Sequence, residues 1–272
     1  ENYQLFIKCG KAKFNIAAKP TDEFPYLPQI VKEKHVEISQ FTLKDIIRQT
    51  VFSISDNENT KVMTGELFEI TDNKLKVVSL DGHRISIRNV ELNNSYDNII
   101  PGKTLIEINK ILNGGVDDIV KIYFTDKHIL FEFENTVVLS RLIEGEYYKI
   151  DKMLSSDYET KITVNKKEML DSIDRTTLLM KESEKKPVII DIKDNSMGLA
   201  MNSSIGSMDE EIDAVKEGKD ILIGFNPRFL IDALRVIDDE EITLYMINPK
   251  APCFIRDKDE SYIYLILPVN FN

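Results

Sequence analysis

The chain has 272 residues, of which 42% are hydrophobic and 30% charged, a composition typical of soluble globular proteins. This length accommodates about two domains of ordinary size, and no apolar run approaches the roughly 18 residues that a membrane span requires. The net charge of -11 argues against wholesale coating of nucleic acid or anionic membrane, but it is compatible with a local basic face.

The chain begins with Glu1 rather than Met and has no signal peptide, so we expect a fragment of a longer, cytoplasmic protein. Its two cysteines, Cys9 and Cys253, are far apart and lack metal-ligand spacing. A disulfide between them is one alternative. We expect instead two buried thiols in a reducing cytosol.

The first 30 residues alternate between apolar and polar side chains. The alternation predicts strands over residues 3–8 and 12–16, and Pro20, Pro25 and Pro28 then predict a linker. Because a two-stranded sheet is at best marginally stable alone, we expect this piece to lean on another domain.

A helix is predicted over residues 41–55. The apolar residues of this segment recur at helical spacing and form one stripe: Leu43, Ile46, Ile47, Val51 and Ile54. Thr42 is the expected N-cap, with Asp45 completing an approximate capping box.

The stretch from Met63 to Arg88 predicts a β-hairpin followed by a further strand. Apolar residues recur at about every second position in 66–70 and 74–80, which are joined by a polar turn at 71–74. Asp81-Gly82 then predicts another turn. His83 and Arg84 would lie at the end of the next strand, beside a glycine that permits close approach of another segment.

The rest of the chain repeats one order of elements. A helix from Pro101 is stopped by Gly114-Gly115 and precedes strands over 118–124, 128–133 and 135–142. The same order returns about 120 to 125 residues later, which indicates duplication of a whole domain. The later elements are a strand at 161–164, a helix at 165–180, strands at 188–192 and 196–201, a helix at 226–237, and strands at 241–246, 253–256 and 262–267.

These elements predict an α+β fold of two duplicated domains, each with two helices packed on curved antiparallel sheets. We expect residues 1–30 to be the tail of a mostly missing first domain. Residues 31–157 would form a middle domain, and residues 158–272 a C-terminal domain.

The residues give little support to an enzyme. His83 near Asp81 has the elements of a general base, but no nucleophile motif is nearby, and His35, His83 and His128 lack metal spacing. Gly102-Lys103-Thr104 resembles the end of a phosphate-binding loop, but Asp97 replaces the required first glycine. We therefore expect no catalytic residues, no bound metal and no cofactor.

Charged residues recur on the second helix of each half. Lys103, Glu107 and Lys110 have the same spacing as Arg228, Asp232 and Arg235. One interpretation is a solvated face with ion pairs between neighbouring turns. The other is a shared binding face, because positions seven apart lie on one side of a helix.

Two stretches resemble the sliding clamp family of bacterial DNA polymerase III beta subunits. These are the hairpin that begins Gly65-Glu-Leu-Phe-Glu and leads into Asp81-Gly-His-Arg, and the segment Tyr262-Ile-Tyr-Leu-Ile-Leu-Pro-Val-Asn. The resemblance covers nearly the whole chain. It implies that residues 31–272 are the middle and C-terminal domains of such a clamp.

The resemblance implies a groove that receives short peptides carrying a glutamine and two apolar anchors. Carried over residue by residue, the groove would use Met63, Leu80, Gly82, His83, Arg84, Ile85, Tyr148, Lys152, Met153, Asn226, Phe229, Leu265, Ile266, Leu267, Pro268 and Val269. The chain departs from the family pattern in two places. Tyr148 stands where the family commonly has proline, and Asn270 where it often has arginine.

The resemblance also implies contact with double-stranded DNA, without sequence preference, through helices that line a ring. The residues expected to face the phosphates are Lys44, Arg48, Lys61, Lys103, Lys110, Arg175, Arg228 and Arg235. Such phosphate contacts carry no sequence information, which suits a clamp that slides and keeps the polymerase processive.

The implied partners are the replicative polymerase, the clamp loader and repair proteins with clamp-binding peptides. The full-length form is expected to be a head-to-tail homodimer ring, without a membrane partner. Because most of the first domain is missing, we expect this chain alone not to close the ring, which light scattering after size exclusion would test. The rival hypothesis is a peptide-binding scaffold of the same fold with no DNA role.

Overall fold

The structure is a computed structural model that describes residues 3–32, 35–92, 96–180 and 186–271. Residues 1–33 form one compact unit and residues 34–272 a second, larger one.

The small unit contains the predicted pair of strands. β1 (Gln4–Cys9) pairs antiparallel with β2 (Ala12–Ala17), and a 3-10 turn follows at Thr21–Glu23. The cysteines do not form a disulfide. Cys253 is a buried free thiol as expected, but Cys9 is exposed, so the prediction of two buried thiols was wrong for Cys9. The reason is that both strands of this hairpin are exposed along their whole length, with no second layer over them among residues 3–32.

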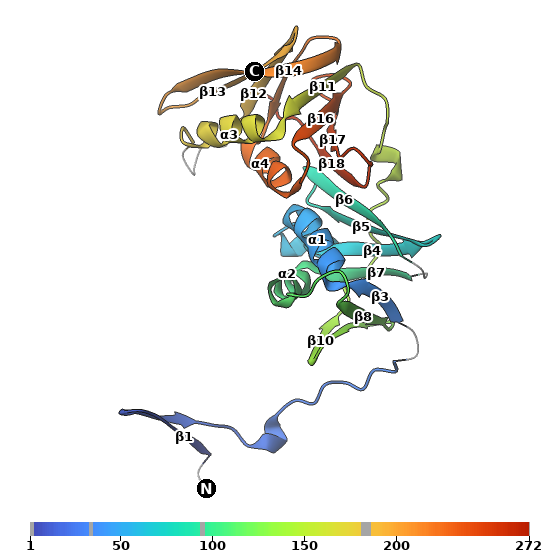
Figure 1. The fold of residues 1–272 in the computed structure, drawn as a ribbon, viewed down its shortest axis with the longest axis vertical. Coiled ribbons are helices and arrows are strands. Elements are labelled where there is room, and N and C mark those ends of the chain that lie inside the picture. The colour runs from blue at the N-terminus through green and yellow to red at the C-terminus, as the bar shows by residue number, and fades with distance from the viewer. Residues whose placement is uncertain (1–2, 33–34, 93–95, 181–185, 272) are drawn as a thin grey trace. The chain divides into compact units, whose positions relative to one another are not determined.

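The large unit repeats one order of ten elements (Figure 1), which confirms the predicted α+β fold and its duplication. The first half contains β3 (His35–Ser39), α1 (Gln40–Thr50), β4 (Gly65–Thr71), β5 (Lys74–Leu80), β6 (Arg84–Glu91), β7 (Tyr96–Pro101), α2 (Gly102–Ile111), β8 (Ile119–Phe124), β9 (His128–Phe133) and β10 (Thr136–Arg141). The second half contains β11 (Thr160–Asn165), α3 (Lys166–Thr177), β12 (Val188–Lys193), β13 (Ser196–Asn202), β14 (Ser207–Gly218), β15 (Ile221–Phe225), α4 (Pro227–Val236), β16 (Glu241–Met246), β17 (Cys253–Arg256) and β18 (Tyr262–Ile266). We call residues 142–159 the linker.

Two sheets organise the large unit. β10, β9, β8 and β3 form a four-stranded sheet, and the other strands form a twelve-stranded sheet in the order β15-β12-β13-β14-β11-β16-β17-β18-β6-β5-β4-β7. The larger sheet passes from one half to the other at β18 and β6, which pair antiparallel. The β-sheet therefore continues from one half into the other at this point, although β18 and β6 are far apart in sequence.

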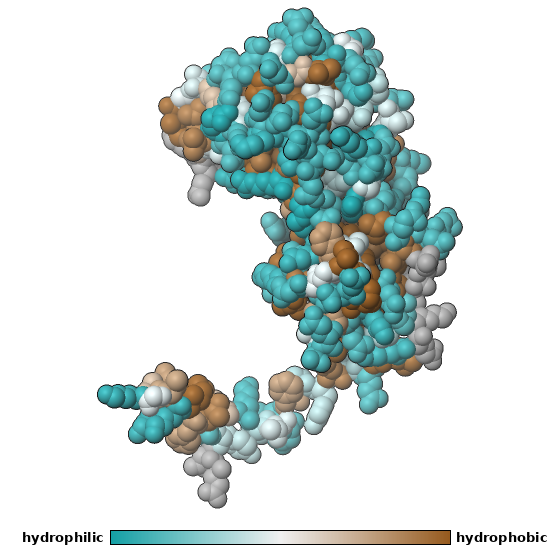
Figure 2. All heavy atoms as spheres, in the orientation of Figure 1, coloured by the Kyte–Doolittle hydropathy of each residue, from teal (hydrophilic) through white to brown (hydrophobic). Residues whose placement is uncertain are grey.

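The four helices lie on one side of the large unit, with strands behind them (Figure 1). α1 contacts α2, α3 contacts α4, and α1 contacts α4, so the helices form one row across both halves. Each half has its own apolar core, in which helix stripes pack on sheet faces. On the face shown in Figure 2, most of the coloured surface of the large unit is hydrophilic.

The N-terminus of α1 differs from the expectation. The helix begins one residue after Ser39, whose Oγ accepts a hydrogen bond from the Thr42 backbone N–H at 3.0 Å. Ser39, with its extended backbone, is thus the N-cap, and the predicted N-cap Thr42 was wrong. Asp45 bonds Arg48 instead of closing a capping box. The helix also ends at Thr50, because residues 51–53 tighten into a 3-10 turn.

The predicted hairpin is present, with its turn at Asp72 and Asn73. Both residues have positive φ, 50° and 61°, which matches the twist of a two-residue hairpin turn. β14 and β15 were not predicted. β14 is rich in charge, and only Ile212 and Ala214 of this strand are buried, so its sequence shows little apolar alternation.

Glu66 is a fully buried carboxyl group in β4. Its Oε2 lies 2.9 Å from Thr50 Oγ1, and Thr50 Oγ1 also lies 2.8 Å from the Ile46 carbonyl oxygen. The Thr50 hydroxyl has one proton, which it shares between the Ile46 carbonyl oxygen and Glu66 Oε2. Burial raises the pKa of Glu66 to about 8, and the Thr50 hydrogen bond opposes this shift only in part.

The stability of the fold should therefore fall as the pH rises from about 4.5 to about 8. In this window the folded chain holds a proton that the unfolded chain has released, so the free energy of unfolding decreases by up to about 1.4 kcal/mol per pH unit. Urea unfolding followed by circular dichroism across this range should show the decrease. Glu66→Gln should remove it, whereas the control Glu69→Gln on the same strand should keep it. An unchanged slope in Glu66→Gln would contradict a protonated Glu66.

Candidate functional site: a crevice between the two halves

The candidate site lies where β18 pairs with β6. Leu265 is opposite Ile85, Ile266 is opposite Arg84, and the backbone N–H of Leu267 donates to the His83 carbonyl at 2.9 Å. The C-terminal strand of the second half is therefore held against the Asp81-Gly-His-Arg turn of the first half. This is the juxtaposition that the groove prediction required.

An apolar pocket of about 140 Å³ opens at this pairing, and we call it the interdomain crevice. Its lining residues are Met63, Leu80, Gly82, His83, Arg84, Ile85, Tyr148, Ile150, Met153, Leu265 and Leu267. All of them except Ile150 belong to the predicted groove. Met153 and Tyr148 are about half exposed, at 46% and 48%, so they form an accessible rim over a buried floor.

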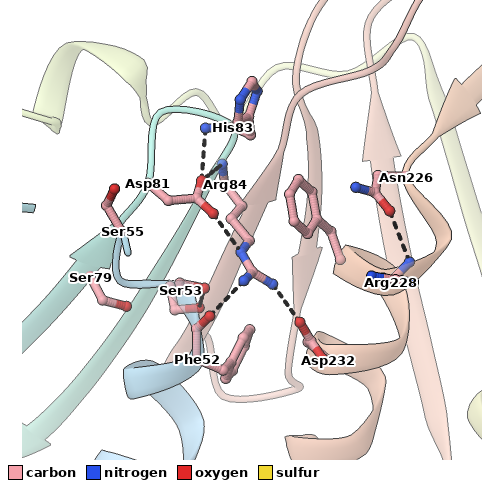
Figure 3. Close-up of polar contacts among 12 residues, drawn as sticks. Phe52, Ser53, Ser55, Ser79, Asp81, His83, Arg84, Asn226, Arg228 and Asp232 are labelled. Atoms are coloured by element: carbon pink, nitrogen blue, oxygen red, sulfur yellow. Dashed lines mark hydrogen bonds and ion pairs between the residues drawn. The ribbon is translucent and has the colours of Figure 1, made fainter. Parts of the chain in front are cut away.

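Arg84 links the two halves behind the crevice (Figure 3). Its guanidinium donates to Asp81 Oδ2 at 3.0 Å, to the Phe52 carbonyl at 2.6 Å and to Asp232 Oδ2 of α4 at 2.7 Å. It also lies over the Phe229 ring, 4.3 Å from the centroid. Burial by itself lowers the pKa of Arg84, but Tyr264, Asp232 and Asp81 together raise it above its ordinary value, so the side chain stays charged.

The turn before Arg84 is fixed by Asp81. Its Oδ1 accepts hydrogen bonds from the backbone N–H groups of His83 and Arg84, at 2.9 and 3.1 Å. Gly82 has a φ of +89°, a left-handed conformation that favours glycine. Since both oxygens of Asp81 bind the turn and Arg84, Asp81 does not orient the His83 ring as a general base would require. The exposed His83 ring stacks on Phe229 instead, with centroids 6.1 Å apart.

Several predicted groove residues lie outside the crevice lining. Ile266 is fully buried in the core of the second half, because alternate side chains of β18 point to opposite faces. Asn226 caps α4 by accepting from the Arg228 backbone N–H at 3.1 Å. Phe229 is half-buried beside His83 and Arg84. Three more predicted residues are on the surface or half-buried near it: Lys152, Pro268 and Val269.

The linker contributes two residues that the sequence reasoning missed. Ile150 is 3% exposed and lines the crevice. Tyr147 is buried, with its hydroxyl 3.3 Å from the Gly65 carbonyl and 3.2 Å from the Val78 carbonyl, so it fixes the linker to the sheet. The sequence signal that could have identified these two residues is the apolar character of their positions within the linker. Tyr148, which stands where the family commonly has proline, is more exposed than its neighbour Tyr147 and forms part of the crevice rim.

Six of the cations predicted to face DNA already bind protein groups. Lys44 donates to the Leu112 carbonyl at the end of α2, at 2.9 Å, and Arg48 bonds Asp45 on its own helix and Asp238 in the other half. The other pairs are Lys103 with Glu58, Lys110 with Glu107, Arg175 with Glu210, and Arg235 with Asp174. Within the described residues, Lys61 and Arg228 have no carboxylate partner.

The helix row is nonetheless mildly positive. α1, α2 and α4 each carry two basic residues and one acidic residue, and α3 carries three of each. The ion-pair interpretation holds for Lys110 and Glu107, which are 2.7 Å apart on α2. It does not hold for Asp232, which binds Arg84 instead of a neighbour on α4.

A basic pocket of about 410 Å³ adds two cations that the sequence did not single out. Its lining residues are Glu58, Lys61, Thr64, Pro101, Lys103, Lys127, Arg141, Leu142, Ile143 and Glu144. Lys127 and Arg141 come from strand ends with no helical charge pattern, so only the fold places them beside Lys61 and Lys103.

Comparison with known proteins decides the family. The family described as DNA polymerase III beta subunit, central domain, matches residues 37–149, and its C-terminal domain matches residues 151–270. The chain belongs to the DNA polymerase III beta subunit family. The beta sliding clamp of Bacillus subtilis is 36% identical over 98% of this chain and 72% of that protein. That of Staphylococcus aureus is 34% identical over 99% of this chain and 73% of its own length.

Solved structures of beta subunits have the same fold. A DNA polymerase III beta subunit from Eubacterium rectale superposes with a TM-score of 0.94, at 62% identity, and the match covers 99% of this chain and 74% of that one. The Bacillus subtilis sliding clamp also gives 0.94, at 36% identity, with 100% and 73% covered. The resemblance found in the sequence is thus confirmed. In the described parts of this beta subunit, no helix is both long and apolar enough to cross a bilayer.

Removing the Arg84 side chain should destabilise this beta subunit. Arg84→Leu leaves Asp81 and Asp232 without their guanidinium partner, and we expect a loss of roughly 2 to 4 kcal/mol in the free energy of unfolding. The matched control is Arg228→Leu on the exposed N-terminus of α4, which should change the stability by less than about 0.5 kcal/mol. Urea denaturation measures both, and equal effects would show that Arg84 does not link the halves.

Proposed function

We propose that this chain acts as a sliding clamp of the bacterial replicative DNA polymerase. It encircles duplex DNA as part of a ring and docks the polymerase, the clamp loader and repair proteins through the interdomain crevice. The observation that carries the proposal is the crevice itself, formed where β18 meets the Asp81-Gly-His-Arg turn in a member of the beta subunit family.

The chemistry of the crevice suits a short peptide with apolar anchors. Its floor is built from leucine and isoleucine side chains, and burial of an apolar anchor contributes about 1.5 to 3 kcal/mol. Two such anchors and a few hydrogen bonds, less the cost of ordering the peptide, give an affinity near the micromolar range. Such weak binding allows partners to exchange at one shared site.

The helix row suits a threaded duplex. Its net positive charge is small and most of its cations are held by carboxylates, so single phosphates are attracted without being fixed in place. Phosphate contacts carry no sequence information, and weak local contacts let a ring move along the duplex. In this proposal the ring topology, rather than strong binding or catalysis, keeps the polymerase on its template.

A fluorescent peptide with one glutamine and two apolar anchors should bind the wild-type chain with micromolar affinity. Met153→Ala and Leu267→Ala each remove part of the crevice wall and should weaken binding by roughly tenfold. His83→Ala should also weaken docking of the peptide. Leu222→Ala, at an exposed apolar residue of β15, is the control and should leave the affinity unchanged. Fluorescence anisotropy gives these affinities, and equal binding by all four variants would exclude the crevice.

Duplex DNA should bind weakly at low salt, with an affinity that falls steeply as salt is added. Lys61→Ala and Arg228→Ala each remove a cation that has no carboxylate partner among the described residues, and each should lower the salt slope by about one. Lys250→Ala, outside the four helices, is the control. A peptide-binding scaffold without a DNA role predicts no binding even at low salt.

A further inference from the structure

A second cleft lies beside the interdomain crevice, and we call it the acidic cleft. It has a volume of about 620 Å³, against about 140 Å³ for the crevice. Its lining residues are Leu67, Glu69, Lys76, Asp97, Asn98, Ile99, Asp126, Leu142, Ile143, Glu144, Gly145, Glu146, Tyr147, Tyr148, Lys149, Ile150 and Asp151. The cleft is therefore bounded by β4, β5 and β7 on one side and by the linker on the other.

The acidic cleft and the crevice share part of their lining. Tyr148 and Ile150 of the linker line both hollows. Ile150 is buried, and Tyr148 is 48% exposed. A peptide chain that leaves the crevice over Tyr148 is therefore next to residues of the acidic cleft.

The charge of the cleft is unbalanced. Its six carboxylates face only two lysines, of which Lys76 pairs with Asp151 at 2.9 Å and with Glu69 at 3.7 Å. Lys149 pairs with Glu146 at 3.4 Å. The three remaining carboxylates, on Asp97, Asp126 and Glu144, are exposed and form no ion pair within the described residues. Glu144 also lines the basic pocket.

The spacing of these carboxylates favours a chain of separate positive charges over a single metal ion. No three metal-ligating side chains converge anywhere in the described residues. The floor between the carboxylates is apolar, with Leu67, Ile99 and Ile143 among its residues. Lysine and arginine bury their methylene stems on apolar surface while the charged ends stay in water, so both features of the cleft fit these two residue types.

We propose that the acidic cleft binds a lysine- or arginine-rich segment that flanks the peptide docked in the interdomain crevice. The inference rests on the proposed function, since the crevice positions the partner whose flank enters the cleft. The flank adds affinity through charge, so partners that share the same anchors are ranked by their neighbouring residues. The contribution is screened by salt because the carboxylates are exposed.

The test uses the complete chain and four fluorescent peptides. One carries only the glutamine and the two anchors, two add three lysines at the N- or C-terminal end, and one replaces the favoured lysines with glutamates. We expect one lysine extension to raise the affinity about three- to tenfold at low salt, because exposed charge pairs are individually weak. The glutamate extension should lower it, and the gain should vanish near 0.5 M salt.

A charge-neutralising variant assigns the gain to the cleft. In Asp97→Asn/Asp126→Asn/Glu144→Gln the extended peptide should bind no better than the short one, while the short peptide keeps its wild-type affinity. The matched control Asp209→Asn/Glu211→Gln/Asp213→Asn makes the same change of charge on exposed positions of β14 and should keep the gain.

Two outcomes overturn the inference and leave the proposed function intact: no gain from either lysine extension, or a gain that persists in the cleft variant. Failure of the short peptide to bind the wild-type chain would instead remove the proposed docking function, and the inference with it.

Discussion

The pairing of β18 with β6 is the interaction on which the rest of the large unit depends. Because alternate side chains of a strand point to opposite faces, this one pairing gives two surfaces. On one face, Ile85 and Leu265 contribute to the apolar cluster below the crevice. On the other face, Arg84 meets Asp232 and lies beside Tyr264. The site and the connection between the halves therefore come from the same backbone contact.

Ser53, Ser86, Tyr264 and Arg84 all have hydrogen-bond partners behind the crevice. Ser53 and Ser86 hydroxyls are 2.7 Å apart, and the Tyr264 hydroxyl donates to the Phe229 carbonyl at 2.9 Å. A buried guanidinium is costly unless its hydrogen bonds are satisfied, and Arg84 meets this condition with partners from both halves. The two halves must keep one relative position to preserve these bonds, and that position also sets the width of the crevice.

The outer surface carries a different kind of interaction. The linker passes between a small apolar crevice and a larger acidic cleft, and it contributes Tyr148 to both. Apolar anchors give binding energy over short distances, whereas exposed carboxylates act through a field that salt weakens. A partner that reaches both hollows is thus recognised by two separable contributions to its binding free energy, apolar burial in the crevice and electrostatic attraction in the cleft.

Much of this arrangement could be predicted from the sequence, and the exceptions have physical causes. Regular alternation in the hairpin and the repeated order of elements indicated the fold, and the Asp81-Gly-His-Arg turn located one wall of the site. The sequence did not show that the Arg84 guanidinium would form ion pairs with Asp81 and Asp232, because long-range ion pairs leave no periodic signal. It likewise placed Ile266 in the groove, since the facing direction of a strand residue depends on a register that only the pairing fixes. Basic residues at strand ends, such as Lys127, were missed for the same reason.

The most direct test of the account is a crystal structure of this chain bound to a peptide with a glutamine and two apolar anchors. The account predicts that the anchors lie between Ile85 of β6 and Leu267 beyond β18, with the β6–β18 pairing and the Arg84–Asp232 contact intact. A peptide bound on one half alone, or a complex in which β18 has separated from β6, would contradict it.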